Sequence, residues 1–155
     1  MRRTASVLAA VTATLAVAGC GVQESTGNAG GTADNYFHDL GSENYPAACQ
    51  LLSTDLRQRL GDCPAALRER HRLAVGQRNE LTTVSVRHVV YHGKDKAQVY
   101  PKDVTVYTTV TVRVRGTPTP RSSAVRSLAA NFATDGQGLE LAKVGDAWQI
   151  SGGGV

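Results

Sequence analysis

The most constraining feature of the sequence is a regular alternation of residue types between positions 104 and 115. Successive side chains of a β-strand point to opposite faces, so a period of two predicts a strand whose faces differ. One face is rich in threonine and arginine, and the other is mainly aliphatic: Val104, Val106, Thr108, Val110, Val112 and Val114. We therefore expect the valine face to cover a hydrophobic core and the opposite face to meet water.

Shorter segments on both sides of this strand also favour β-structure. We expect strands at residues 82–92 and 97–100, followed near the C-terminus by a hairpin of residues 139–144 and 147–151. Gly145 and Asp146 supply the turn of that hairpin, because glycine and aspartate are typical of tight turns.

The connecting segments are less regular. Residues 116–123, GTPTPRSS, are expected to form a loop, because proline and glycine dominate them. Residues 124–134 are compatible with either a helix or a strand, and residues 135–138 with a turn. Residues 152–155 are expected to be a disordered tail.

The part of the chain before Gly76 carries the start and stop signals of helices. Helix-capping residues predict four helix starts, at Thr32, Ser42, Ser53 and Asp62. Helices followed by antiparallel strands predict an α+β fold, with the N-terminal helices packed on the sheet.

The N-terminus has the layout of an export signal. Arg2 and Arg3 precede a charge-free stretch from Thr4 to Gly19, which is shorter than the ~20 residues of a membrane span. The stretch ends in Val-Ala-Gly-Cys at positions 17–20, which resembles the lipobox of bacterial lipoproteins. Two alternatives remain, namely an ordinary secretory signal with a chance cysteine and an uncleaved anchor.

The lipobox resemblance implies removal of a signal peptide, residues 1–19, and lipidation of Cys20. The chain would then be anchored by membrane lipid on the extracytoplasmic face of the cell membrane. Arginine outnumbers lysine 13 to 4, which suits an actinobacterial-type envelope. Residues 20–33 are expected to be a flexible tether, since Gly21 to Ala33 contain no aromatic residue and one aliphatic residue, Val22.

Two cysteines remain once Cys20 is assigned to lipid. An even number of thiols in an oxidising compartment predicts a disulfide between Cys49 and Cys63. A metal site or catalytic thiol has no support, since the chain has no C-x-x-C motif and the nearest histidine, His71, is eight residues beyond Cys63. No metal and no cofactor are expected.

The charge and aromatic content argue against a nucleic-acid partner. The formal net charge is +4, or +2 without Arg2 and Arg3, and aromatic residues make up 5% of the chain. Basic runs such as Arg113 and Arg115 are typical of a solvated face, and the alternative is contact with anionic lipid headgroups.

Three motifs, in their order along the chain, resemble the nuclear transport factor 2-like superfamily, and within it the exported SnoaL-like lipoproteins. They are NYPAACQLLS at residues 44–53, the segment from Leu60 to Leu67, and VGDAWQI at residues 144–150. The resemblance spans most of residues 34–151 and implies a curved antiparallel sheet wrapped around helices into a cone, with a pocket inside. We expect four residues to line that pocket: Tyr36, His88, Thr108 and Trp148.

His88 has three possible roles. It shares the apolar face of its expected strand with Val86 and Val90, so it would line the pocket, act as a base, or be a buried histidine bonded to a neighbour.

The expected function is non-catalytic binding, either of a small apolar ligand or of a protein partner in the envelope. One alternative is a SnoaL-like or ketosteroid isomerase-like enzyme outside the membrane, for which Asp103 and Tyr107 are the candidate acid–base residues. Another is a structural accessory of an envelope complex. The sequence alone does not separate them.

Overall fold

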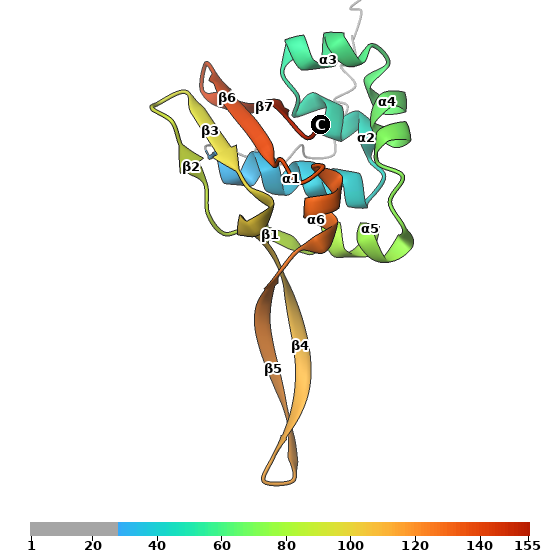
Figure 1. Ribbon diagram of the computed structural model, residues 1–155, viewed down its shortest axis with the longest axis vertical. Coiled ribbons are helices and arrows are strands. Elements are labelled where there is room, and N and C mark those ends of the chain that lie inside the picture. Colours follow the sequence, from blue (N-terminus) through green and yellow to red (C-terminus); the bar gives the residue numbers. More distant parts are fainter. Residues whose placement is uncertain (1–27) are drawn as a thin grey trace, which may run out of the picture.

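The computed structural model describes residues 28–155 and has an α+β fold (Figure 1). Cys20, the expected signal peptide and residues 20–27 of the expected tether lie outside the described residues. The helices of the described part are α1 (Ala29–Gly41), α2 (Tyr45–Gln50), α3 (Thr54–Leu60), α4 (Cys63–Arg70), α5 (Val75–Leu81) and α6 (Leu128–Ala133).

Local capping explains where two of these helices begin. The Ser53 hydroxyl accepts a hydrogen bond from the Leu56 N–H at 3.3 Å, and the Asp62 carboxylate accepts one from the Ala65 N–H, also at 3.3 Å. Both helix starts therefore confirm the prediction. The helix expected from Ser42 begins instead after Asn44.

The expected tether is too long, because α1 begins at Ala29. The Asn28 side chain caps this helix by accepting a hydrogen bond from the Gly31 N–H at 2.6 Å. Ala29, Gly30 and Ala33 are buried. Their small side chains resemble those of a linker, but here they allow close packing. The Cβ of any residue replacing Gly30 would lie 3.3 Å from the Val89 side chain.

A disulfide between Cys49 and Cys63 joins α2 to the first residue of α4, as predicted. The two Cα atoms are 6.1 Å apart and the cysteines are 14 positions apart in the chain. A closed loop of this length stabilises the folded state by about 3 kcal/mol in the chain-entropy description.

The strands form two antiparallel sheets rather than the one curved sheet that was expected. One sheet has the order β1-β4-β5 and the other the order β2-β3-β6-β7. The expected strand at residues 82–92 is divided between them, because residues 87–89 are irregular. The bounds are β1 (Val84–Val86), β2 (Val90–Tyr91), β3 (Lys96–Val99), β4 (Val104–Val114), β5 (Thr117–Arg126), β6 (Leu139–Val144) and β7 (Ala147–Gly153).

Helix α1 supplies the centre of the core and contacts β1, β3 and β7. Its buried side chains Tyr36, Phe37 and Leu40 belong to one core cluster with strand residues such as Leu141 and Ile150. Polar contacts also fix α1 to the sheet, because the Asp34 carboxylate accepts a hydrogen bond from the Val86 N–H at 2.7 Å.

The C-terminus is part of the fold, which corrects the expected disordered tail at residues 152–155. Strand β7 continues to Gly153, and the Gly154 N–H donates a hydrogen bond to the Gly138 carbonyl at 2.9 Å. Gly154 and Val155 are buried. Glycine at position 154 permits this arrangement, since its backbone lies against the backbone of Thr134.

The last strand also meets the N-terminal helices. The Ser53 N–H donates to the Ile150 carbonyl at 2.7 Å, and the Ile150 N–H donates to the Leu51 carbonyl at 2.8 Å. This parallel bridge, centred on Leu52 and Ile150, ties the segment between α2 and α3 to β7.

Candidate functional site: an exposed β-hairpin

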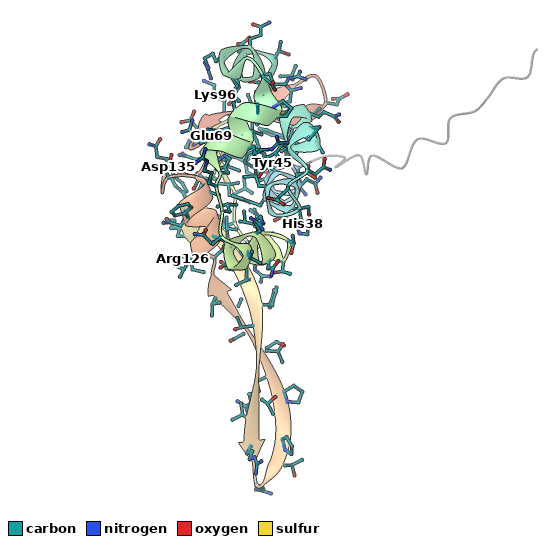
Figure 2. The ribbon with its side chains drawn as sticks, turned by 90° about the vertical axis from the view of Figure 1, so that its right-hand side faces the viewer. His38, Tyr45, Glu69, Lys96, Arg126 and Asp135 are labelled. Atoms are coloured by element: carbon teal, nitrogen blue, oxygen red, sulfur yellow. A yellow bond between two sulfur atoms is a disulfide. The ribbon has the colours of Figure 1, made fainter. Side chains whose placement is uncertain are left out.

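The most prominent surface feature is the hairpin of β4 and β5, which projects away from the rest of the fold (Figures 1 and 2). We call residues 107–124 of this hairpin the arm and the other described residues the body. All of β5 is exposed, and Tyr107 and Val112 on β4 are 54% and 40% exposed. The arm therefore has no counterpart to the hydrophobic core of the body.

The arm corrects two expectations from the sequence. On the valine face of β4, Val104 and Val106 are buried in the core, whereas Thr108 and Val112 are exposed. The expected loop GTPTPRSS is largely strand, and β5 includes both Pro118 and Pro120. The alternation identified β4, but it could not show how far the body extends beneath it.

Turn geometry and register explain how β5 accommodates its prolines. Arg115 and Gly116 have φ values of 51° and 85°, as in the two-residue turns that favour hairpins. The Ser127 N–H donates to the Val104 carbonyl at 2.8 Å, so even-numbered residues of β4 make the hydrogen bonds to the returning strand. Pro118 and Pro120 pair with odd-numbered residues of β4, where the proline nitrogen points outward and no ladder bond is lost.

Because only the even-numbered residues of β4 bond to β5, the backbone groups of its odd-numbered residues point to the other edge of the strand, which is open beyond β1. Strand β1 pairs with β4 only as far as Val106, and the Arg87 N–H donates to the Asp103 carbonyl at 2.8 Å on that side. Beyond Val106, the outward backbone groups belong to the odd-numbered residues Tyr107, Thr109, Thr111 and Arg113. Within residues 28–155, no strand pairs with this edge.

Charge separates the arm from the body. The arm contains three arginines and no acidic residue, namely Arg113, Arg115 and Arg121. Outside the arm, the described residues carry twelve basic and twelve acidic side chains. The net positive charge of the described chain is therefore located on the arm.

Exposed apolar side chains gather at the base of the arm. Leu128 and Phe132 of α6, which directly follows β5, are 74% and 57% exposed. Polar contacts hold α6 in place: the Ser127 hydroxyl donates to Glu80 Oε1 at 2.6 Å and accepts from the Ala130 N–H at 2.9 Å. The apolar face of α6 is thus held outward beside the arm.

The four residues predicted to line a pocket do not come together. Tyr36 on α1 and Trp148 on β7 are buried in the core, and the Trp148 ring centroid lies 5.8 Å from that of Tyr91. His88 is exposed between β1 and β2, and Thr108 is exposed on the arm. These positions do not describe one shared cavity.

The buried histidine of this fold is His71, not His88. His71 Nε2 lies 3.4 Å from the Tyr36 hydroxyl, and both side chains are buried. Burial, aided by the neighbouring Arg70 guanidinium, lowers the pKa of His71 to about 4, while Asp135 acts in the opposite direction. Burial raises the pKa of Tyr36, so both groups are neutral near pH 7. The sequence signal was the helical spacing from Leu67 to His71.

This pair predicts a loss of stability in mild acid. The unfolded chain binds a proton at His71 near pH 6.5, whereas the folded chain does so only near pH 4. The free energy of unfolding should therefore fall as the pH is lowered through this window, by up to about 1.4 kcal/mol per pH unit from this group. His71→Gln should remove this part of the slope in urea denaturation measured across pH. His88→Gln, at an exposed position, should leave it intact, and equal slopes in both variants would contradict the assignment.

The two candidate acid–base residues do not form a pocket pair. Asp103 Oδ2 is buried and has no hydrogen-bond partner among the described residues. Tyr107 lies four residues further along the chain, about 13 Å away by strand rise, and its exposed hydroxyl accepts a hydrogen bond from Arg87.

Residues 28–155 hold no group of three or more histidine, cysteine or acidic residues placed to bind a metal ion. No helix in the same range has the length and apolar character required to cross a bilayer. The chain matches no family model, no curated protein and no solved structure.

Proposed function

We propose that this chain is an exported, lipid-anchored protein of the cell envelope, and that it binds a protein partner through the arm without catalysis. The observation that carries the proposal is the exposure of the whole of β5 together with the exposed apolar residues Leu128 and Phe132 at its base. Exposed apolar surface beside a positively charged element is typical of an interaction site.

A protein partner is favoured over a small apolar ligand. The ligand hypothesis relied on Tyr36, His88, Thr108 and Trp148, and two of these are exposed while two are core residues. A structural accessory would use the same surface, since docking on a larger complex also requires an exposed element. The enzyme alternative draws no comparable support from Asp103 and Tyr107, which are separated along the base of the arm.

The envelope location rests on the N-terminal sequence and on the cysteines. The lipobox-like residues 17–20 support anchoring through Cys20, and the Cys49–Cys63 disulfide suits an oxidising compartment. A relation to the nuclear transport factor 2-like superfamily, with its cone-shaped sheet, is likewise proposed. It is supported by the sequence motifs and by the order of helices followed by antiparallel strands.

Site-specific photo-cross-linking on intact cells tests the binding function. A photoreactive amino acid at Thr111, near the tip of the arm, should give discrete protein adducts. The control position is Gln58, which is exposed on α3 at the opposite end of the molecule (Figure 1). Adducts from Gln58 but none from Thr111 would overturn the arm as the binding element.

A further inference from the structure

The arm offers one backbone edge on which a further strand fits. We propose that its partner presents an extended segment in which acidic and aliphatic residues alternate, and that this segment adds as a strand to the open edge of β4. The inference rests on the proposed function, because it takes the arm as the binding element and names what the arm binds.

The open edge of β4 is on the side where β1 pairs with it, and it begins where β1 ends. Strand β1 occupies this side of β4 up to the pair Val84 and Val106, and the edge is open from Tyr107 to Val114. Those eight positions extend about 27 Å at the usual strand rise. Outward N–H and C=O groups at alternate residues provide the main-chain hydrogen bonds of strand addition.

The other edge of the arm is protected against strand addition. Pro118 and Pro120 sit on β5 at outward positions, where an added strand would need N–H donors that proline lacks. The β4 edge has no proline between Tyr107 and Val114. Strand addition is therefore directed to β4.

Charge on the polar face of the arm selects the side chains of the added strand. Arg113 lies near the tip on this face, and at the base the Arg87 guanidinium donates a hydrogen bond to the Tyr107 hydroxyl. The two arginines bracket the open edge, and the arm contains no acidic residue to neutralise Arg113. Acidic side chains on this face of the added strand would lie close to the guanidinium groups of Arg113 and Arg87.

The opposite face of the arm carries the valines of β4, of which Val112 is 40% exposed. On β5 the same face carries Thr119 and Arg121, which pair with Val112 and Val110. An added strand would lie directly beside the β4 valines, so the residues on its second face would be aliphatic. A second copy of this chain is disfavoured as the occupant, since two arms of equal positive charge would repel each other.

A matched pair of variants isolates the β4 edge. Thr109 and Ser122 are paired across the hairpin, and their hydroxyl groups are 3.0 Å apart. Thr109→Pro and Ser122→Pro each remove that contact and one outward N–H, but on opposite edges of the arm. Pro118 and Pro120 show that the ribbon accepts proline at outward positions. Circular dichroism and melting curves would verify that both variants fold.

The probe is a fluorescein-labelled ten-residue peptide of alternating valine and glutamate, titrated against the full-length chain. Wild type and Ser122→Pro should bind it equally, whereas Thr109→Pro should bind at least tenfold more weakly, because it loses a main-chain donor and its ring obstructs the added strand. Arg113→Gln should also weaken binding. A peptide of alternating valine and lysine should not bind.

Three results would overturn the inference. The first is equal affinity of Thr109→Pro and Ser122→Pro for the valine–glutamate peptide, and the second is equal affinity of wild type for the two peptides. The third is arginine-dependent binding confined to phosphatidylglycerol vesicles, which would make the arm a lipid contact. Adducts from Thr111 on cells would still support the proposed function in the first two cases, whereas their absence would overturn the proposed function itself.

Discussion

Gly154→Ala should lower the free energy of unfolding by about 3 kcal/mol or more, because the added methyl group has no space. The new Cβ would overlap the Thr134 carbonyl, which is backbone and cannot move aside like a flexible side chain. Thr134 is fully buried, and its hydroxyl donates to the Ala130 carbonyl at 2.9 Å, so the end of α6 is held in place. Urea denaturation of the full-length chain would measure the loss.

Gly76→Ala is the matched control for this glycine substitution. Gly76 lies in α5, and no heavy atom lies within 4 Å of the position of an added Cβ. Alanine is favoured over glycine in helices by about 1 kcal/mol, so this variant should be neutral or slightly stabilised. Wild-type stability in Gly154→Ala would mean that the C-terminus does not dock against Thr134.

Cys20→Ser should abolish stable membrane retention of the chain. The proposed anchor is attached through a thioether at the Cys20 thiol, and a serine hydroxyl cannot form that linkage. The variant should appear as uncleaved precursor or as protein released from membranes. Cell fractionation would show this directly, and intact mass measurement would report whether residues 1–19 are present and whether acyl chains have been added.

The double variant Cys49→Ser/Cys63→Ser is the control for the anchor prediction. It removes the other two thiols and the disulfide but leaves the lipobox-like residues unchanged. This variant should be less stable yet still lipidated and retained, since two acyl chains hold a protein stably at a bilayer. Unchanged processing and retention of Cys20→Ser would rule out the proposed anchor.

The parts of the fold that follow from neighbouring residues were predictable. Ser53 and Asp62 begin helices because their side chains accept hydrogen bonds from free N–H groups three residues onward. The alternation at residues 104–114 identifies β4, and the turn at Gly145 and Asp146 joins β6 to β7. Each of these signals is contained within a few positions of the sequence.

The features that depend on distant residues were not predictable. Nothing near Val112 in the sequence shows that the body ends before it, so the valine face seemed to require a core along its whole length. Pro118 and Pro120 suggested a loop, because their compatibility with a strand depends on the register with β4. The small residues after Asn28 suggested a tether, although their size suits them to packing in α1.

The same distinction applies to the candidate site. His88 seemed buried because it alternates with valines, but residues 87–89 leave the strand geometry and expose it. His71 lies among arginines in the sequence, yet the turn after α4 directs it to Tyr36 on α1. Arg113 and Arg115 can be identified in the sequence. The open edge of β4, which gives the arm its proposed role, can be identified only from the pairing of the strands.

The bridge between Ile150 and the segment around Leu52 determines when this chain can finish folding. A ribosome makes the α2–α3 segment long before it makes β7. This segment therefore cannot form its bridge until β7 has been synthesised. Contacts between such distant segments form slowly, because a long loop must close first. For a chain that is exported as proposed, completion of the body is postponed until its final residues have crossed the membrane.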